Sequence, residues 1–298
     1  MDDNGVYSFI MSALPKRIST LLREALLSGK IFEEIRLRRN MPVSVTCKGK
    51  SYFISSGGEF SLYSENPIYC LDDEFENALL ILCENSVFAH TKEIENGYIS
   101  APGGIRVGVC GDFSPSLSGI VSANIRIPRQ IKGCADEVFF RFSGGMLLAG
   151  PPCSGKTTML RELIRKLSLS GYRICVIDSR REISGGMIFD LGPNTDAMYV
   201  ADRAFGAASA LKTMYPQIIA FDEIGTLKEA QSVLEAFNSG VYILTTAHAS
   251  SVSELTKRPA TGELIASGVL KTIVLLSKNI GEKPRIYDVQ EIINEIDC

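Results

Sequence analysis

Several features that would place this chain in a specialised class are missing from its 298 residues. No apolar run is long enough to cross a bilayer, so we expect no transmembrane segment. The eight cysteines form no C-x-x-C pair and no metal-site spacing, so reduced thiols in the cytoplasm are the simplest expectation. The net charge is −3, and bulk charge therefore gives no reason to expect nucleic acid or an anionic membrane as a partner.

A glycine-rich segment is the most informative feature that is present. Residues 150–158 read GPPCSGKTT and fit the P-loop pattern G-x-x-x-x-G-K-[ST]. An apolar run at 146–149 precedes the segment, and apolar residues at helical spacing follow it to 169. In the context of strand, glycine loop and helix, backbone N–H groups and a helix N-terminus hold phosphate oxygens. We therefore predict a nucleotide site formed by Gly150, Pro151, Pro152, Cys153, Ser154, Gly155, Lys156, Thr157 and Thr158.

Strand and helix patterns alternate through the rest of the second half. Apolar strands are expected at 172–177, 217–221, 241–245, 272–276 and 286–289, and helices at 201–214 and 228–237. This alternation predicts an α/β domain with a mostly parallel sheet that is covered on both faces. Ligands of such sheets bind beyond the carboxyl ends of the strands.

Residues that suit phosphate and metal chemistry follow the apolar strands. Residues 218–223, IIAFDE, have the form of a Walker B motif. There Asp222 would hold Mg²⁺ together with the Thr157 hydroxyl, while Lys156 reaches the β/γ-phosphates. Glu223 would orient and deprotonate the attacking water.

Three further polar residues lie at the ends of predicted strands. Glu182 is a second candidate for positioning the water, and the residues alone do not decide between it and Glu223. Asp178 ends the 172–177 strand and is a further candidate for the metal shell. His248 follows the 241–245 strand, where a sensor of the γ-phosphate would lie.

The first half predicts a smaller α+β domain at 1–140, with the P-loop domain at 141–298. Helices are expected at 15–28 and 72–89, the second with Asp72 or Asp73 as N-cap. Strands are expected at 31–38, 105–109 and 120–128, with a hairpin between 41–47 and 51–55. Arg106, Arg126 and Arg129 are either solvated charges or groups that reach a phosphate on a neighbouring subunit.

These motifs together resemble the secretion-ATPase branch of the RecA-like P-loop enzymes. Its Walker A, Asp box, Walker B and His box would be residues 150–158, 178–182, 218–223 and 245–248 here. The first-half segments EIRLR (34–38), GYI (97–99), PGGIRVGVCG (102–111) and IRI (125–127) are similar to the stage III sporulation protein AA family. DEIG (222–225) and TAH (246–248) extend that similarity, which covers the chain from about residue 30 to about residue 290.

The resemblance implies a RecA-like ATPase that uses ATP and Mg²⁺ and assembles as a ring-shaped homohexamer. It implies a cytoplasmic protein that is peripheral to the membrane through its partners, which would be membrane proteins of the channel between mother cell and forespore. No nucleic acid is expected as a partner. The chain departs from the family at Asn194 and Lys212, where arginine is usual, so no role is carried over to these positions.

Two other hypotheses remain open at this point. The first is a RecA-like translocase or ATPase that binds nucleic acid, for which the basic cluster at 36–39 is the one local hint. The second is a nucleotide-gated scaffold that hydrolyses little or no ATP, against which the two carboxylate candidates argue. Dependence of turnover on single-stranded DNA would separate the first hypothesis from a secretion-type ATPase.

Overall fold

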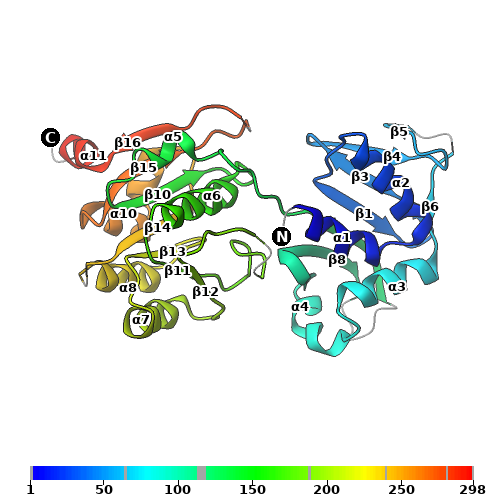
Figure 1. Ribbon diagram of the computed structural model, residues 1–298, viewed down its shortest axis with the longest axis horizontal. Helices are drawn as coiled ribbons and strands as arrows, with labels where there is room; N and C mark the ends of the chain where they lie inside the picture. Colours follow the sequence, from blue (N-terminus) through cyan, green and yellow to red (C-terminus); the bar gives the residue numbers. More distant parts are fainter. Residues whose placement is uncertain are drawn as a thin grey trace. The chain divides into compact units, whose positions relative to one another are not determined.

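The computed structural model describes residues 3–63, 66–112, 119–186, 189–238, 240–279 and 281–296. The chain divides into two compact units, Met1–Arg129 and Gln130–Cys298, and each contains a seven-stranded sheet (Figure 1). The division falls earlier than the boundary near residue 140 that the sequence suggests. Residues 130–139 belong to the second unit because Ala135 and Val138, the latter in helix α5 (Asp136–Phe139), are buried in its core.

The sheet of the second unit is parallel except at one edge, where β15 and β16 pair antiparallel. Its order is β12-β11-β13-β14-β10-β15-β16. In chain order the strands are β10 (Gly145–Gly150), β11 (Ile174–Ile177), β12 (Thr195–Met198), β13 (Ile218–Phe221), β14 (Tyr242–His248), β15 (Leu270–Leu275) and β16 (Arg285–Asp288). The predicted α/β fold with a mostly parallel sheet is confirmed.

Helices cover both faces of this parallel sheet. One face packs against α5 and α6 (Lys156–Leu169). The other packs against α7 (Arg203–Thr213), α8 (Leu227–Asn238), α9 (Val252–Lys257), α10 (Pro259–Ala266) and α11 (Val289–Ile296). Successive strand residues alternate between the two cores, as Leu147 and Leu148 of β10 do. The inner strands β10, β11 and β13 are therefore apolar along their whole length, which leaves their ends for polar chemistry.

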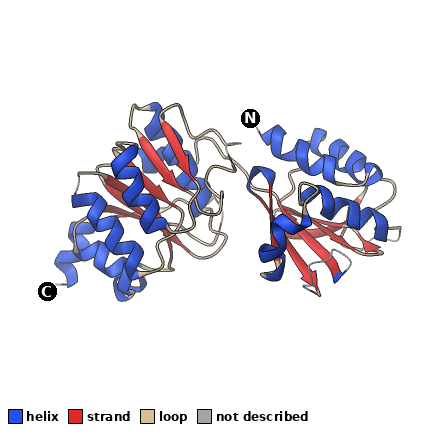
Figure 2. Ribbon diagram, turned by 90° about the horizontal axis from the view of Figure 1, so that it is seen from below, coloured by secondary structure: helices blue, strands red, loops and turns tan. Residues whose placement is uncertain are grey.

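The sheet of the first unit is antiparallel, in the order β5-β4-β3-β1-β9-β8-β7. The strands are β1 (Glu34–Arg38), β3 (Ser44–Cys47), β4 (Lys50–Ile54), β5 (Phe60–Ser61), β7 (Tyr98–Ala101), β8 (Ile105–Gly111) and β9 (Ile120–Arg126). Two short strands, β2 (Met41–Pro42) and β6 (Tyr69–Cys70), form a separate pair. Helices α1 (Asp3–Ala13), α2 (Lys16–Leu27) and α3 (Asp72–Leu82) lie on one side of the sheet (Figure 2).

Two details of the first unit differ from the prediction. The helix expected at 72–89 ends at Leu82, because Glu84 and Asn85 adopt left-handed φ angles of 53° and 61°. Short helices η1 (Val87–His90) and α4 (Thr91–Glu95) follow, and η2 (Pro102–Gly104) precedes β8. The N-cap of α3 is Leu71 rather than Asp72 or Asp73, and its backbone N–H donates to Glu74. Within the described residues, every helix is too short or too polar to span a bilayer.

Candidate nucleotide site

The predicted phosphate loop connects β10 to α6, and its nine residues lie in that connection, at the end of β10 or in the first turn of α6. Gly155 is the N-cap of α6 with a φ of 89°, and Cys153 is also left-handed with a φ of 61°. A Cβ on Gly150 would lie 2.5 Å from Ser154 Oγ, so only glycine fits there. The free N–H groups at the start of α6, from Lys156 onward, therefore face this loop.

Lys156 is buried and bonded to its own loop. Its Nζ donates to the carbonyl oxygens of Gly150 at 3.0 Å and Pro151 at 2.8 Å. The same Nζ lies 3.1 Å from Nδ1 of His248. An ammonium group can only donate, so Nδ1 accepts and the imidazole proton lies on Nε2. Burial lowers the pKa of Lys156, and nearby carboxylates partly oppose this change.

Strand pairing brings the Walker B and His-box residues to the same edge of the sheet. Gly150 pairs directly with His248 across β10 and β14, and β13, which ends immediately before Asp222, is the next strand. The Thr157 hydroxyl donates to Asp222 Oδ1 at 3.0 Å. His248 Nε2 lies 3.8 Å from Glu223 Oε1. At this edge Thr157 and Asp222 supply two oxygen ligands of the kind that Mg²⁺ prefers. Beside them, His248 lies between Lys156 and Glu223.

The carboxylate of Asp178, in the Asp box, accepts hydrogen bonds from residues that follow it closely in the sequence. Asp178 is buried and accepts hydrogen bonds from the backbone N–H groups of Ile183 at 3.3 Å and Ser184 at 2.8 Å. The Ser184 hydroxyl donates to the same carboxylate at 2.7 Å. Arg161 of α6 donates to the carbonyl oxygens of Ile183 and Glu182, each at 2.7 Å. Arg161 therefore connects the Asp-box segment to the P-loop helix α6. The hydrogen bonds of Asp178 stabilise the turn that leads from Asp178 to Ser184.

Arg106, Arg126 and Arg129 all belong to the first unit. Arg106 and Arg126 lie directly opposite each other across β8 and β9, and Arg126 is also opposite Glu34 of β1. The Arg126 side chain is 56% exposed and 3.9 Å from Glu34. Arg129 lies 3.9 Å from Glu33. With Arg36 and Arg38 of β1, Arg106 and Arg126 form a surface that we call the arginine face.

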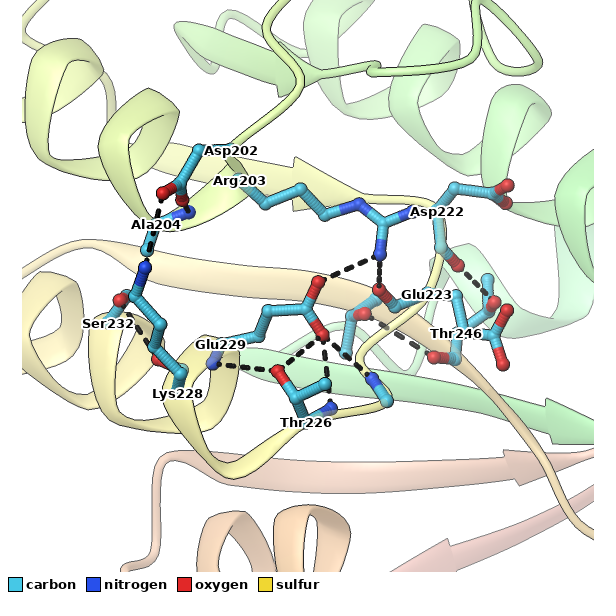
Figure 3. Close-up of polar contacts among 12 residues, drawn as sticks. Asp202, Arg203, Ala204, Asp222, Glu223, Thr226, Lys228, Glu229, Ser232 and Thr246 are labelled. Atoms are coloured by element: carbon cyan, nitrogen blue, oxygen red, sulfur yellow. Dashed lines mark hydrogen bonds and ion pairs between the residues drawn. The ribbon is translucent and has the colours of Figure 1, made fainter. Parts of the chain in front are cut away.

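Sequence reasoning missed the groups that fix the Walker B segment (Figure 3). These are Arg203, Thr226, Glu229 and Thr246, whose hydrogen bonds converge on residues 222–226. A signal for two of them was present, since Thr226-Leu227-Lys228-Glu229 fits the capping-box pattern T-x-x-E at a helix start. Nothing in the sequence marks Arg203, because its acceptors are backbone and side-chain oxygens on other elements.

Fold and loop geometry together define an α/β protein of the P-loop class. The family described as "Sporulation stage III, protein AA" matches residues 7–294, and the chain belongs to that family. "Stage III sporulation protein AA" of Bacillus subtilis (strain 168) is 30% identical over 280 residues, which are 86% of this chain and 86% of that protein. The family resemblance drawn from the sequence is therefore confirmed.

Solved structures share the fold over nearly the whole chain. The ATPase DotB of Legionella pneumophila has a TM-score of 0.62 at 16% identity, with 95% of this chain and 83% of that chain covered. The pilus retraction motor PilT with bound ADP has a TM-score of 0.62 at 18% identity, with 93% and 85% covered. At these identities the similarity shows the fold, which is that of the secretion-type ATPases.

Proposed function

We propose that this chain is a Mg²⁺-dependent ATPase that powers or assembles the channel complex between mother cell and forespore during endospore formation. The observation that carries the proposal is the convergence of Lys156, Thr157, Asp222, Glu223 and His248 at one edge of the parallel sheet. Membership of the sporulation family supports the biological setting. The fold shared with DotB and PilT supports the ATPase class.

The residues at this edge fit a bound nucleotide. Ser154 Oγ is the one buried side-chain polar atom among the described residues that lacks a hydrogen-bond partner. Lys156 bonds to its own loop carbonyls, which phosphate oxygens would replace. The Thr157 hydroxyl and the Asp222 carboxylate are the oxygen ligands that Mg²⁺ prefers. When bound, Mg²⁺ would be held by the Thr157 hydroxyl and the Asp222 carboxylate and would neutralise the charge that develops on the phosphates.

Glu223 is the better candidate for the group that takes the proton of the attacking water. Its carboxylate lies beside His248, which in turn contacts Lys156, the residue expected on the γ-phosphate side. Arg161 of α6 donates to the backbone carbonyl of Glu182, which ties the Asp-box turn to the P-loop helix. We therefore assign Glu223 as the general base and His248 as the sensor of the γ-phosphate. Asp178 and Glu182 have a structural role in the Asp-box turn in this proposal.

The site is completed in trans in this proposal. Arg106, Arg126 or Arg129 of one copy would reach the γ-phosphate held by another copy, within a homohexamer. Arg106 and Arg126 lie directly opposite each other across β8 and β9, and Glu34, 3.9 Å from Arg126, offsets part of the repulsion between them. Such a ring would be cytoplasmic and would reach the membrane through membrane proteins of the channel assembly.

A nucleic-acid translocase is the second candidate, and the arginine face favours it. Of the basic cluster at 36–39, Arg39 is engaged in ion pairs with Asp72 and Glu76. Arg36 and Arg38, however, lie on the same sheet face as Arg106 and Arg126. A row of guanidinium groups on an open sheet can follow a phosphate backbone.

Turnover of ATP per protomer across protein concentrations, with and without single-stranded DNA, separates these candidates, with Lys156→Ala as the blank. The proposed ring ATPase predicts specific activity that rises with protein concentration and is indifferent to DNA. Strong stimulation by DNA would place the translocase first. The absence of turnover above the blank at every concentration would support a nucleotide-gated scaffold instead.

A further inference from the structure

The main chain after β13 is held by hydrogen bonds from three other elements (Figure 3). The Asp222 carbonyl accepts from the hydroxyl of Thr246 on β14, and the Ile224 N–H donates to the Thr246 carbonyl at 3.2 Å. The Glu223 carbonyl accepts from Nη1 of Arg203, at the start of α7, at 2.8 Å. Three consecutive residues are thus fixed through their backbones, although none of these bonds touches the Glu223 carboxylate.

Glu229 extends this fixation to the next two residues. Its Oε2 accepts from the backbone N–H groups of Gly225 at 3.0 Å and Thr226 at 3.1 Å. Its backbone N–H donates back to the Thr226 hydroxyl at 3.3 Å, which completes the capping box of α8. The other oxygen, Oε1, accepts from Nη1 of Arg203 at 3.0 Å. One carboxylate therefore caps α8 and holds the arginine.

The Arg203–Glu229 pair is largely shielded from water. The two side chains are 14% and 20% exposed. Burial alone would raise the pKa of Glu229, but the Gly225 N–H, the Arg203 charge and the Thr226 donors outweigh it, and the pKa is lowered. A charged, shielded pair with both partners hydrogen-bonded keeps a narrow geometry.

We propose that Arg203 and Glu229 are positioning residues for Glu223. Arg203 holds the Glu223 carbonyl, and Glu229 holds both Arg203 and the chain just beyond, so that the Cα–Cβ direction of Glu223 is set before substrate arrives. The inference rests on the proposed function, in which Glu223 takes the proton of the attacking water. A misplaced base loses rate without loss of nucleotide affinity, because it contacts the water rather than the phosphates.

The neighbouring ion pair supplies a matched control. Lys228 and Asp202 also join the starts of α8 and α7, with Nζ and Oδ2 3.1 Å apart. Their side chains are 74% and 54% exposed, and among the described residues their hydrogen bonds reach none of those from 222 to 226. Lys228→Ala therefore removes an inter-helix ion pair of the same kind without freeing the Glu223 carbonyl.

The experiment measures kcat, KM and nucleotide affinity of the full chain for Arg203→Ala, Arg203→Lys, Glu229→Gln and Lys228→Ala, each also in the Glu223→Gln background. We expect Arg203→Ala to lower kcat about 10- to 100-fold with affinity for ATP within about twofold. Glu229→Gln loses less, and Arg203→Lys retains an intermediate rate because lysine keeps a donor but not the fork. Lys228→Ala behaves as wild type.

The double variants identify the route of the effect. If Arg203 acts through Glu223, Arg203→Ala has no further effect on the residual turnover of Glu223→Gln. Equal fold-losses in both backgrounds, or wild-type kcat for Arg203→Ala, would overturn the inference. Loss of folded protein is separated by expressing kcat per bound nucleotide. Failure of the proposed function looks different, since Glu223→Gln itself would then turn over ATP as fast as wild type.

Discussion

The two seven-stranded sheets of this chain present polar groups in opposite ways. The parallel sheet of the second unit is covered on both faces, so its functional candidates gather in the loops at one edge. The antiparallel sheet of the first unit buries one side of each strand, as Ile35 and Val107 show. Its arginines are spread across the other side of three strands. A doubly covered sheet concentrates chemistry at strand ends, whereas a singly covered sheet can carry it on a face.

The largest effect on nucleotide binding is expected at the edge of the parallel sheet. Lys156→Ala removes the buried ammonium that lies between the phosphate loop and His248, so affinity for ATP should fall about 100-fold or more. Titration with a fluorescent ATP analogue measures this. Lys166→Ala is the control. Lys166 lies near the C-terminal end of α6 in an ion pair with Asp136, and this variant should bind ATP with wild-type affinity. Equal affinities for both variants would contradict the assigned site.

The arginine face and Arg129, which also belongs to the first unit, should affect ATP turnover and leave ATP binding unchanged. Loss of the arginine that acts in trans, among Arg106, Arg126 and Arg129, is expected to lower kcat about 1,000-fold while ATP affinity changes less than about twofold. Arg36→Ala, on the same face, is the matched control. Normal turnover in all three alanine variants would show that none of these arginines acts in trans. The arginines would then be solvent-exposed charges without a role in hydrolysis.

Two strand glycines, one in each sheet, differ in how closely the neighbouring backbone approaches them. A Cβ on Gly145 of β10 would lie 2.0 Å from the Val269 carbonyl oxygen, whereas a Cβ on Gly108 of β8 meets nothing within 4 Å. Gly145→Ala should lower the free energy of unfolding by about 3 kcal/mol. Gly108→Ala should leave it unchanged or raise it by about 0.5 kcal/mol. Urea unfolding followed by circular dichroism measures both, and similar losses for the two variants would contradict the difference in free space around the two glycines.

The smallest expected effect is on the stability of the contact between α6 and Gly133, in the first residues of the second unit. The Glu162 side chain of α6 is fully buried and accepts from the Gly133 N–H at 2.8 Å and from Arg165 at 2.7 Å. Burial alone would raise the pKa of Glu162, but Arg165 and the Gly133 N–H outweigh it, so the pKa is lowered. The carboxylate therefore stabilises the fold above about pH 4.3 and loses that contribution as the pH falls further.

Glu162→Gln should accordingly cost about 1–2 kcal/mol of unfolding free energy at pH 7. The gap to wild type should narrow as the pH falls below about 4. Glu137→Gln, at an exposed carboxylate of α5, is the control and should show no comparable change. A gap of the same size at pH 3 and pH 7 would show that the charge of Glu162 is not what holds the segment.

Much of the second unit was predictable because its signals are local. The P-loop pattern and the apolar strands identified β10, α6 and β13 from short stretches of sequence. β12, with residues Thr195–Met198, was missed because its mixed composition shows neither an apolar run nor alternation. β14 was expected to end at Thr245, but it continues to His248 because pairing with β10 extends to Gly150.

The parts that escaped prediction depend on contacts between distant segments. The opposition of Arg106 and Arg126 requires the pairing of β8 with β9, which period-two alternation does not specify. The contacts of Arg203 with the Glu223 carbonyl and Glu229 join α7 to α8 and to the end of β13. Asp178 was predicted as a candidate metal ligand from its place at a strand end, whereas its hydrogen bonds to Ser184 could not be predicted because they depend on the conformation of the turn.

The most direct test of the account is turnover in mixtures of two inactive variants, Lys156→Ala and an inactive alanine variant of Arg106, Arg126 or Arg129. Each alone should hydrolyse almost no ATP. If the arginine acts across subunits, an equimolar mixture regains a substantial fraction of wild-type turnover, because some sites combine an intact Lys156 from one copy with an intact arginine from the other. A mixture no more active than its components would contradict the claim that an arginine of one copy completes the nucleotide site of another.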